Sequence, residues 1–192
     1  LWSVGSMSPE WISRTFFDRP EAARRAGYIS GNPFTVKTDY GPYPRLPVTE
    51  ADVGYLDAAL EEWVQEDADL GISTVPPDAL TDRTIDTWRR RDEVDIDRLV
   101  VHYMQPHTPF LTRPEWFGDA RNLDAFGEPD HDADDEQDVW LRVRDGEVSH
   151  RAVWEAYLDN LRWVLNSVES LRHNCDATVA ITSDHGQGMG EW

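Results

Sequence analysis

The sequence predicts an α/β fold in which a mostly parallel sheet is flanked by helices. Two short apolar runs, at residues 98–104 and 178–183, have the length and composition of buried parallel strands. Between them, from about residue 149 to 173, apolar residues recur at three- and four-residue spacing, as in an amphipathic helix that packs on a sheet. Strands that alternate with long helices are typical of parallel sheets, whose ligands gather at the carboxyl ends of the strands.

The chain before these elements predicts further helices and one strand. Ser8, followed by proline and an acid, is a helix-start signal, and residues 26–33 are typical of a short strand closed by a turn. A sequence similar to a capping box at residues 49–52 predicts a helix whose apolar face contains Leu56, Leu60, Trp63 and Val64. After a break at two prolines, Thr81 is expected to start another helix.

The charge composition indicates adaptation to salt. The net charge is −19, Lys37 is the only lysine, and acidic residues recur along the whole chain. Such a surface suits very high salt, where screening shortens the range of charge repulsion. An ordinary acidic cytosolic protein is the alternative interpretation. Because the same surface repels phosphate backbones, we do not expect nucleic acid as a partner.

Several other classes are disfavoured. Cys175 is the only cysteine, so neither an intrachain disulfide nor a cysteine zinc cluster is expected, and packing is its expected role. No apolar stretch has the length of a membrane span and no signal peptide opens the chain, which predicts a cytoplasmic protein. The chain starts at Leu1 and stops after a glycine-rich loop. We therefore expect residues 1–192 to form a single domain that is incomplete at both ends.

Residues 118–138 are polar and acidic, and we expect them to form a surface insert. Alternate aspartates from Asp130 to Asp134 imitate the start of a calcium loop. However, the sixth position is Asp135 where such loops have glycine, and the twelfth is Leu141 where they have glutamate. A solvated segment is therefore the prediction, with a bound cation as the alternative.

The second apolar run leads into a segment with chemically useful side chains, Ser183 to Gly186. Three consecutive residues cannot form a Ser-His-Asp relay, because its members must meet from separate segments. Asp184 and His185 can instead converge on one cation if the chain leaves strand geometry, which the following glycines permit. A carboxylate beside a neutral imidazole suits Mn²⁺ or Zn²⁺ better than Ca²⁺. An exposed turn is the alternative.

The first apolar run leads to a second candidate, His107. Pro106 and Pro109 flank it, stiffen the loop and hold an imidazole at the exit of the strand. Such an imidazole can hydrogen-bond an anionic substrate oxygen or protonate a leaving group. His102 lies inside the predicted strand, where a hydrogen-bonded core histidine is the expectation.

Together these motifs resemble a known family. "HYMQPHTPF", a long helix and then "TSDHG" resemble sulfatase-like proteins of the alkaline phosphatase superfamily. The likeness extends over nearly the whole chain and is closest to the compact type found in extreme halophiles, through "SPEWISRTF", "YISGNPF", "VPPDALTDRTID", "DNLRWVLNSVESL" and "GEW". It implies an alkaline phosphatase-like fold, Asp184 and His185 as metal ligands, and His107 as a residue that contacts the substrate.

The resemblance also implies a nucleophile, which in this family is Ser, Thr or a modified Cys. Cys175 lies far from the expected place, so a formylglycine nucleophile is not expected, and Ser6 or Ser8 is the candidate. Capping of a helix is the alternative role for Ser8. The family's further metal ligands would lie on a strand before Leu1, and another histidine would follow the final "GEW".

The function that these observations predict is metal-dependent hydrolysis or transfer of a small anionic ester, phosphate or sulfate. We favour phosphate, because no cysteine suits sulfatase maturation and an Asp-His pair favours a transition metal. The alternative is a catalytically incomplete relative, or a gene fragment, that only binds an anionic ligand.

Overall fold

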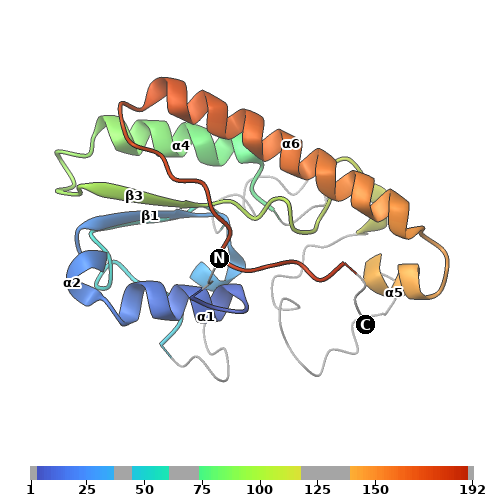
Figure 1. Cartoon of the computed structure of the whole chain (residues 1–192). Coiled ribbons are helices and arrows are strands. Elements are labelled where there is room, and N and C mark those ends of the chain that lie inside the picture. Colours follow the sequence, from blue (N-terminus) through green and yellow to red (C-terminus); the bar gives the residue numbers. More distant parts are fainter. Residues whose placement is uncertain (1–3, 37–44, 61–73, 118–138, 190–192) are drawn as a thin grey trace.

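The computed structural model describes residues 4–36, 45–60, 74–117 and 139–189. It has an α/β fold built on a three-stranded parallel sheet of order β2-β1-β3. The strands are β1 (Ala26–Ser30), β2 (Tyr55–Ala58) and β3 (Arg98–His102). As Figure 1 shows, helices α4 and α6 cover one face of the sheet, and α1 and α2 lie on the other.

The helical segments range from single turns to one long helix. The longest are α4 (Pro77–Arg89) and α6 (His150–Asn174). The shorter ones are α1 (Ser8–Ile12), the π-helix η1 (Ser13–Phe17), α2 (Pro20–Ala23), the 3-10 helices η2 (Pro33–Thr35) and η3 (Pro114–Trp116), and α5 (Val139–Arg144).

The central strand β1 is buried along its whole length, because helices pack on both faces of the sheet. Tyr28 points toward α1 and η1, where it packs with Ile12 and Phe16. The next residue, Ile29, points the other way and packs with Leu80 of α4. This alternation places Tyr28 on the α1 face, on which the N-terminal segment also lies.

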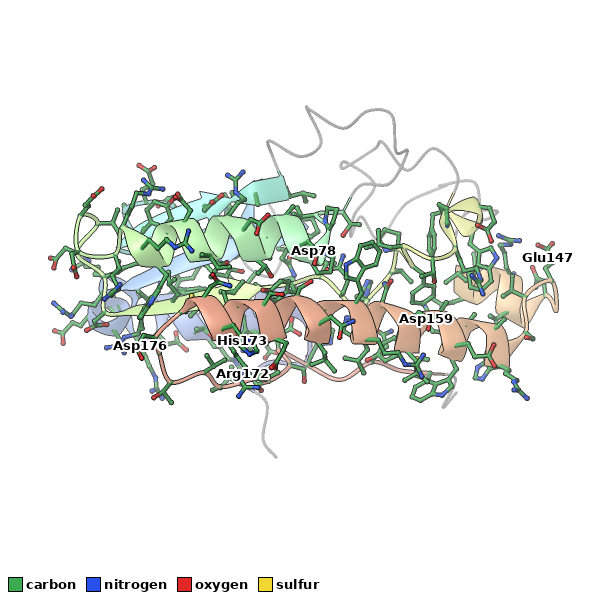
Figure 2. All side chains as sticks on the ribbon, turned by 90° about the horizontal axis from the view of Figure 1, so that it is seen from above. Asp78, Glu147, Asp159, Arg172, His173 and Asp176 are labelled. Atoms are coloured by element: carbon green, nitrogen blue, oxygen red, sulfur yellow. The ribbon has the colours of Figure 1, made fainter. Side chains whose placement is uncertain are left out.

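The predicted long helix is confirmed as α6. Ser149 caps it, because its Oγ accepts a hydrogen bond of 3.1 Å from the backbone N–H of Ala152. On the α4 side, Asp78 accepts hydrogen bonds from Trp163 Nε1 (3.0 Å) and from Ser167 Oγ. Figure 2 shows Asp78 between the two helices. Helix α6 is therefore fixed to α4 by polar contacts as well as by its apolar stripe.

One of the two predicted C-terminal strands is present and the other is not. Residues 98–102 form β3, as expected. The prediction for residues 178–183 is wrong: among the described residues no backbone hydrogen bond joins this segment to β3, and Ile181 is 62% exposed. A cavity of about 600 Å³ lies between the segment and the free edge of β3. Within the part of the chain that the structure describes, this apolar run therefore has no strand neighbour within hydrogen-bonding reach.

The helix predicted after residues 49–52 is wrong at Leu56, which lies in β2, whereas Ala59 and Leu60 are helical. Thr49 does donate to Asp52 Oδ2 through its backbone N–H (3.0 Å) and its hydroxyl (2.6 Å). However, the chain continues into β2, where Leu56 pairs with Tyr28. Pairing with the central strand overrides the helical spacing of the apolar residues. Trp63 and Val64 lie outside the described residues, as does the predicted insert 118–138.

Two smaller expectations have different outcomes. Helix α4 begins at Pro77, one turn before the expected Thr81, because proline is favoured in the first turn of a helix. Cys175 packs with Ile85 and Leu171, as expected of a packing residue, and burial raises the pKa of its thiol.

Among the described helices, none combines the length and the apolar character needed to cross a membrane.

We expect the melting temperature to rise when dilute buffer is replaced by molar KCl. Acidic side chains such as Glu147 and Asp176 are exposed beside the two ends of α6 (Figure 2), and molar salt shortens the screening length to about 3 Å. Screening weakens their mutual repulsion more in the compact folded state than in the unfolded chain. Thermal unfolding followed by circular dichroism measures the change. A melting temperature that stays flat or falls with KCl would contradict salt adaptation.

Candidate functional site

Side chains from the two ends of the described chain meet beside the carboxyl end of β3. The hydroxyl of Ser8 donates a hydrogen bond of 2.6 Å to Asp184 Oδ2, and its oxygen lies 3.3 Å from His185 Nε2. Ser8 and Asp184 are 176 residues apart in the sequence. Figure 1 shows the N-terminal end beside the returning C-terminal segment. The fold thus assembles a hydroxyl, a carboxylate and an imidazole into one cluster.

The backbone sets the orientation of His185. Its Nδ1 lies 2.7 Å from the carbonyl oxygen of Gly186, and a carbonyl can only accept, so Nδ1 carries the hydrogen. The neutral ring then has its lone pair on Nε2, which lies 3.5 Å from Asp184 Oδ2. An imidazole lone pair and a carboxylate oxygen therefore face the same small space.

Asp184 is held in its charged form. Burial raises the pKa of this carboxyl, but the hydrogen bonds from His102 and Ser8 lower it, and the net shift is downward. The pKa of Asp184 therefore lies below its usual range, and the group is a carboxylate at neutral pH. A charged oxygen is the form that ligates a cation.

The donor pair fits a small transition-metal ion in chemistry and in spacing. Two protein ligands on bonds of about 2.1 Å at a tetrahedral angle lie about 3.4 Å apart. The separation of Asp184 Oδ2 and His185 Nε2 is 3.5 Å. Over the described ranges, no group of three or more His, Cys, Asp or Glu side chains is arranged to hold a metal ion. The pair supplies two ligands, whereas a tight site has three or more.

His107 lies on the loop that follows β3, as the sequence predicts. Its Nδ1 lies 2.8 Å from the carbonyl oxygen of Thr108, so Nδ1 donates and Nε2 carries the lone pair. Burial lowers the pKa of His107, whereas its hydrogen bond to the Thr108 carbonyl raises it. The net shift is downward, so the ring is neutral at pH 7.

A buried asparagine of α6 holds this loop, and the sequence predictions missed it. Asn160 is 0% exposed; its Nδ2 donates to the carbonyls of His107 (3.2 Å) and Pro109 (3.1 Å), and its Oδ1 accepts from Leu111 N–H (3.1 Å). The sequence does contain a signal for this residue, because Asn160 is a polar residue on the apolar stripe of the predicted helix. It ties the His107 loop to a rigid element.

The structure separates the two candidate serines. Ser6 donates to Glu10 Oε2 from both its backbone N–H (2.7 Å) and its hydroxyl (2.8 Å), away from the cluster. The capping role for Ser8 is wrong, because Met7 is the N-cap residue of α1 and no side chain caps this helix. The hydroxyl of Ser8 is directed to Asp184 instead. Only Ser8 of the two therefore reaches the acidic and imidazole groups.

His102 was predicted to be a hydrogen-bonded core histidine, and it also reaches the cluster. Its Nδ1 lies 2.8 Å from the hydroxyl of Tyr28, and its Nε2 lies 3.4 Å from Asp184 Oδ2. Its position was not predictable, because the contact depends on where residues 183–185 return to the sheet.

Comparisons of the chain with protein-family models, with curated proteins and with solved structures found no match.

Proposed function

We propose that this chain carries catalytic residues of a metal-dependent hydrolase or transferase of phosphate or sulfate esters, with an alkaline phosphatase-like fold. The observation that carries the proposal is the convergence of Ser8 Oγ, Asp184 Oδ2 and His185 Nε2 within 3.5 Å of one another. A nucleophile beside an anionic and an imidazole ligand is the arrangement that metal-assisted ester cleavage requires.

In this proposal Asp184 and His185 hold Mn²⁺ or Zn²⁺. When bound, the ion lowers the pKa of the nucleophile and offsets negative charge on the transferred group. Ser8 is the nucleophile, because its hydroxyl is the one directed into the donor pair. Phosphate is favoured over sulfate, since Cys175 packs against Ile85 and Leu171 and offers no formylglycine nucleophile.

In this proposal His107 acts on the reacting groups and does not bind the metal ion. The neutral ring has its lone pair on Nε2, because Nδ1 donates to the Thr108 carbonyl. Nε2 can therefore take a proton from the water that attacks the Ser8 ester in the second step and return it to Ser8 Oγ as that oxygen leaves. Burial favours the neutral form, so the base role is available at neutral pH.

Replacing Ser8 with alanine tests the proposal. We expect turnover of aryl phosphate or aryl sulfate esters, assayed with Mn²⁺ or Zn²⁺ in molar KCl, to fall by roughly three orders of magnitude or more. Ser6→Ala is the matched control, because it removes a nearby serine hydroxyl that bonds to Glu10 and not to Asp184. Equal activities in the two variants would show that Ser8 is not the nucleophile. No hydrolysis of either ester class by the wild-type protein would overturn the proposal.

A further inference from the structure

A chain of buried hydroxyl groups runs from the core toward the candidate site. The Ser30 Oγ accepts hydrogen bonds from Thr35 Oγ1 (2.7 Å) and from the backbone N–H of Asn32 (3.0 Å). With both lone pairs engaged, Ser30 has its own proton left, and it donates this proton to the hydroxyl of Tyr28 at 3.2 Å. Ser30 and Tyr28 are fully buried, so no bulk water competes for these bonds.

The direction of this chain determines how Tyr28 meets His102. Because the Tyr28 oxygen accepts from Ser30, its own proton is free to donate to His102 Nδ1, 2.8 Å away. Burial raises the pKa of Tyr28 above its usual range, so the hydroxyl keeps this proton. His102 Nδ1 must then offer a lone pair. In the neutral ring, the hydrogen is consequently on Nε2.

Two groups face His102 Nε2, and they favour different tautomers. Asp184 Oδ2 lies 3.4 Å away and can only accept, whereas Asn32 Nδ2 lies 3.5 Å away and can only donate. The amide orientation of Asn32 is set by its Oδ1, which accepts from Phe34 N–H at 3.0 Å. A carboxylate is the stronger partner, since hydrogen bonds to charged groups are about twice as strong as neutral ones. The Tyr28 hydroxyl at Nδ1 and the Asp184 carboxylate at Nε2 therefore favour the same tautomer of His102, with hydrogen on Nε2.

We propose that Tyr28 holds His102 in the tautomer with hydrogen on Nε2, and that His102 is thereby a positioning residue that orients the carboxylate of Asp184. The His102 ring also packs against Trp11 in an edge-type arrangement, with the ring centroids 5.2 Å apart. Second partners of this kind fix the orientation of metal-binding side chains. The role of Asp184 as an oriented metal ligand rests on the proposed function, whereas the tautomer of His102 does not.

Nuclear magnetic resonance of the protein with ¹⁵N-labelled histidine tests the inference, because the ring nitrogen shifts distinguish the two neutral tautomers and the doubly protonated ring. The wild type is expected to show His102 with hydrogen on Nε2 alone. Tyr28→Phe removes the donor to Nδ1 and is expected to populate the other tautomer. Tyr103→Phe is the matched control, because that hydroxyl bonds to Thr81 at 2.7 Å. It should leave His102 unchanged.

The metal titration gives the second readout. Tyr28→Phe is expected to weaken Mn²⁺ affinity by about tenfold relative to Tyr103→Phe, as loss of a second-layer partner does. A wild-type His102 with hydrogen on Nδ1, or with both nitrogens protonated, would overturn the inference even if Tyr28→Phe failed to fold. An unchanged tautomer in a folded Tyr28→Phe variant would also overturn it. If the nitrogen shifts show the expected tautomers but the wild type binds no Mn²⁺, the inference about His102 holds and the proposed metal site is wrong.

Discussion

Replacing Asp184 with alanine is expected to abolish metal-supported ester hydrolysis. The carboxylate is one of the two proposed ligands, it accepts a hydrogen bond from the Ser8 hydroxyl, and its Oδ2 lies 3.4 Å from His102 Nε2. Its removal therefore takes away a ligand and the group that orients the nucleophile. Initial rates at saturating Mn²⁺ or Zn²⁺ measure the effect, and we expect a loss of roughly three orders of magnitude or more.

Two further variants separate this effect from general damage. Asp176→Ala removes an exposed aspartate after the end of α6 (Figure 2) and should keep wild-type activity. His107→Ala should slow turnover but leave metal affinity nearly unchanged, because His107 acts on the substrate and not on the ion. If Asp184→Ala retains activity, residues 183–186 form only a turn.

The largest effect on stability is expected at Asn160. Asn160→Ala leaves the carbonyls of His107 and Pro109 and the N–H of Leu111 without their partner. Buried polar groups that lose a partner cost about 1–3 kcal/mol each, and partial access of water reduces the sum. We expect a loss of about 2–4 kcal/mol in the free energy of unfolding, measured by urea unfolding in molar KCl.

Asn166→Ala is the matched control for that measurement. Asn166 lies on the same helix, but its side chain is exposed. Its replacement should change the free energy of unfolding by less than about 0.5 kcal/mol. A similar small change at Asn160 would mean that the loop around His107 does not depend on its contact with α6.

Elements with a strong local pattern were predictable from the sequence. The apolar stripe and the serine cap place α6 almost to the residue, and the compact apolar run places β3. The strand and turn over residues 26–33 appear as β1 and a turn capped by Asn32. Each of these patterns is local, so it identifies a helix or strand without reference to the segment that packs beside it.

Elements that depend on a distant partner were not predictable. Residues 55–58 have helical spacing but become β2, because the edge of β1 offers backbone hydrogen bonds at that place. Residues 178–183 have strand composition but pair with no strand among the described residues, because the cavity separates them from β3. Composition describes what a segment can pair with and not whether a neighbouring strand is within reach.

The candidate site divides in the same way. Asp184, His185 and His107 were identifiable as residue types that follow apolar runs, and Ser8 was one of two candidates. The contact of His102 with Asp184 and the support of the His107 loop by Asn160 arise only when separate segments come together. Such supporting residues resemble ordinary core positions until their partners are known.

Metal titration of the wild-type protein beside Asp184→Ala tests the central claim most directly. Calorimetric titration with Mn²⁺ and Zn²⁺ in molar KCl should show saturable binding to the wild type, with one ion per chain. Because two described side chains supply ligands, we expect weak binding from these residues alone and no binding in Asp184→Ala. Equal binding by both proteins, or none by the wild type, would contradict a metal site at Asp184 and His185.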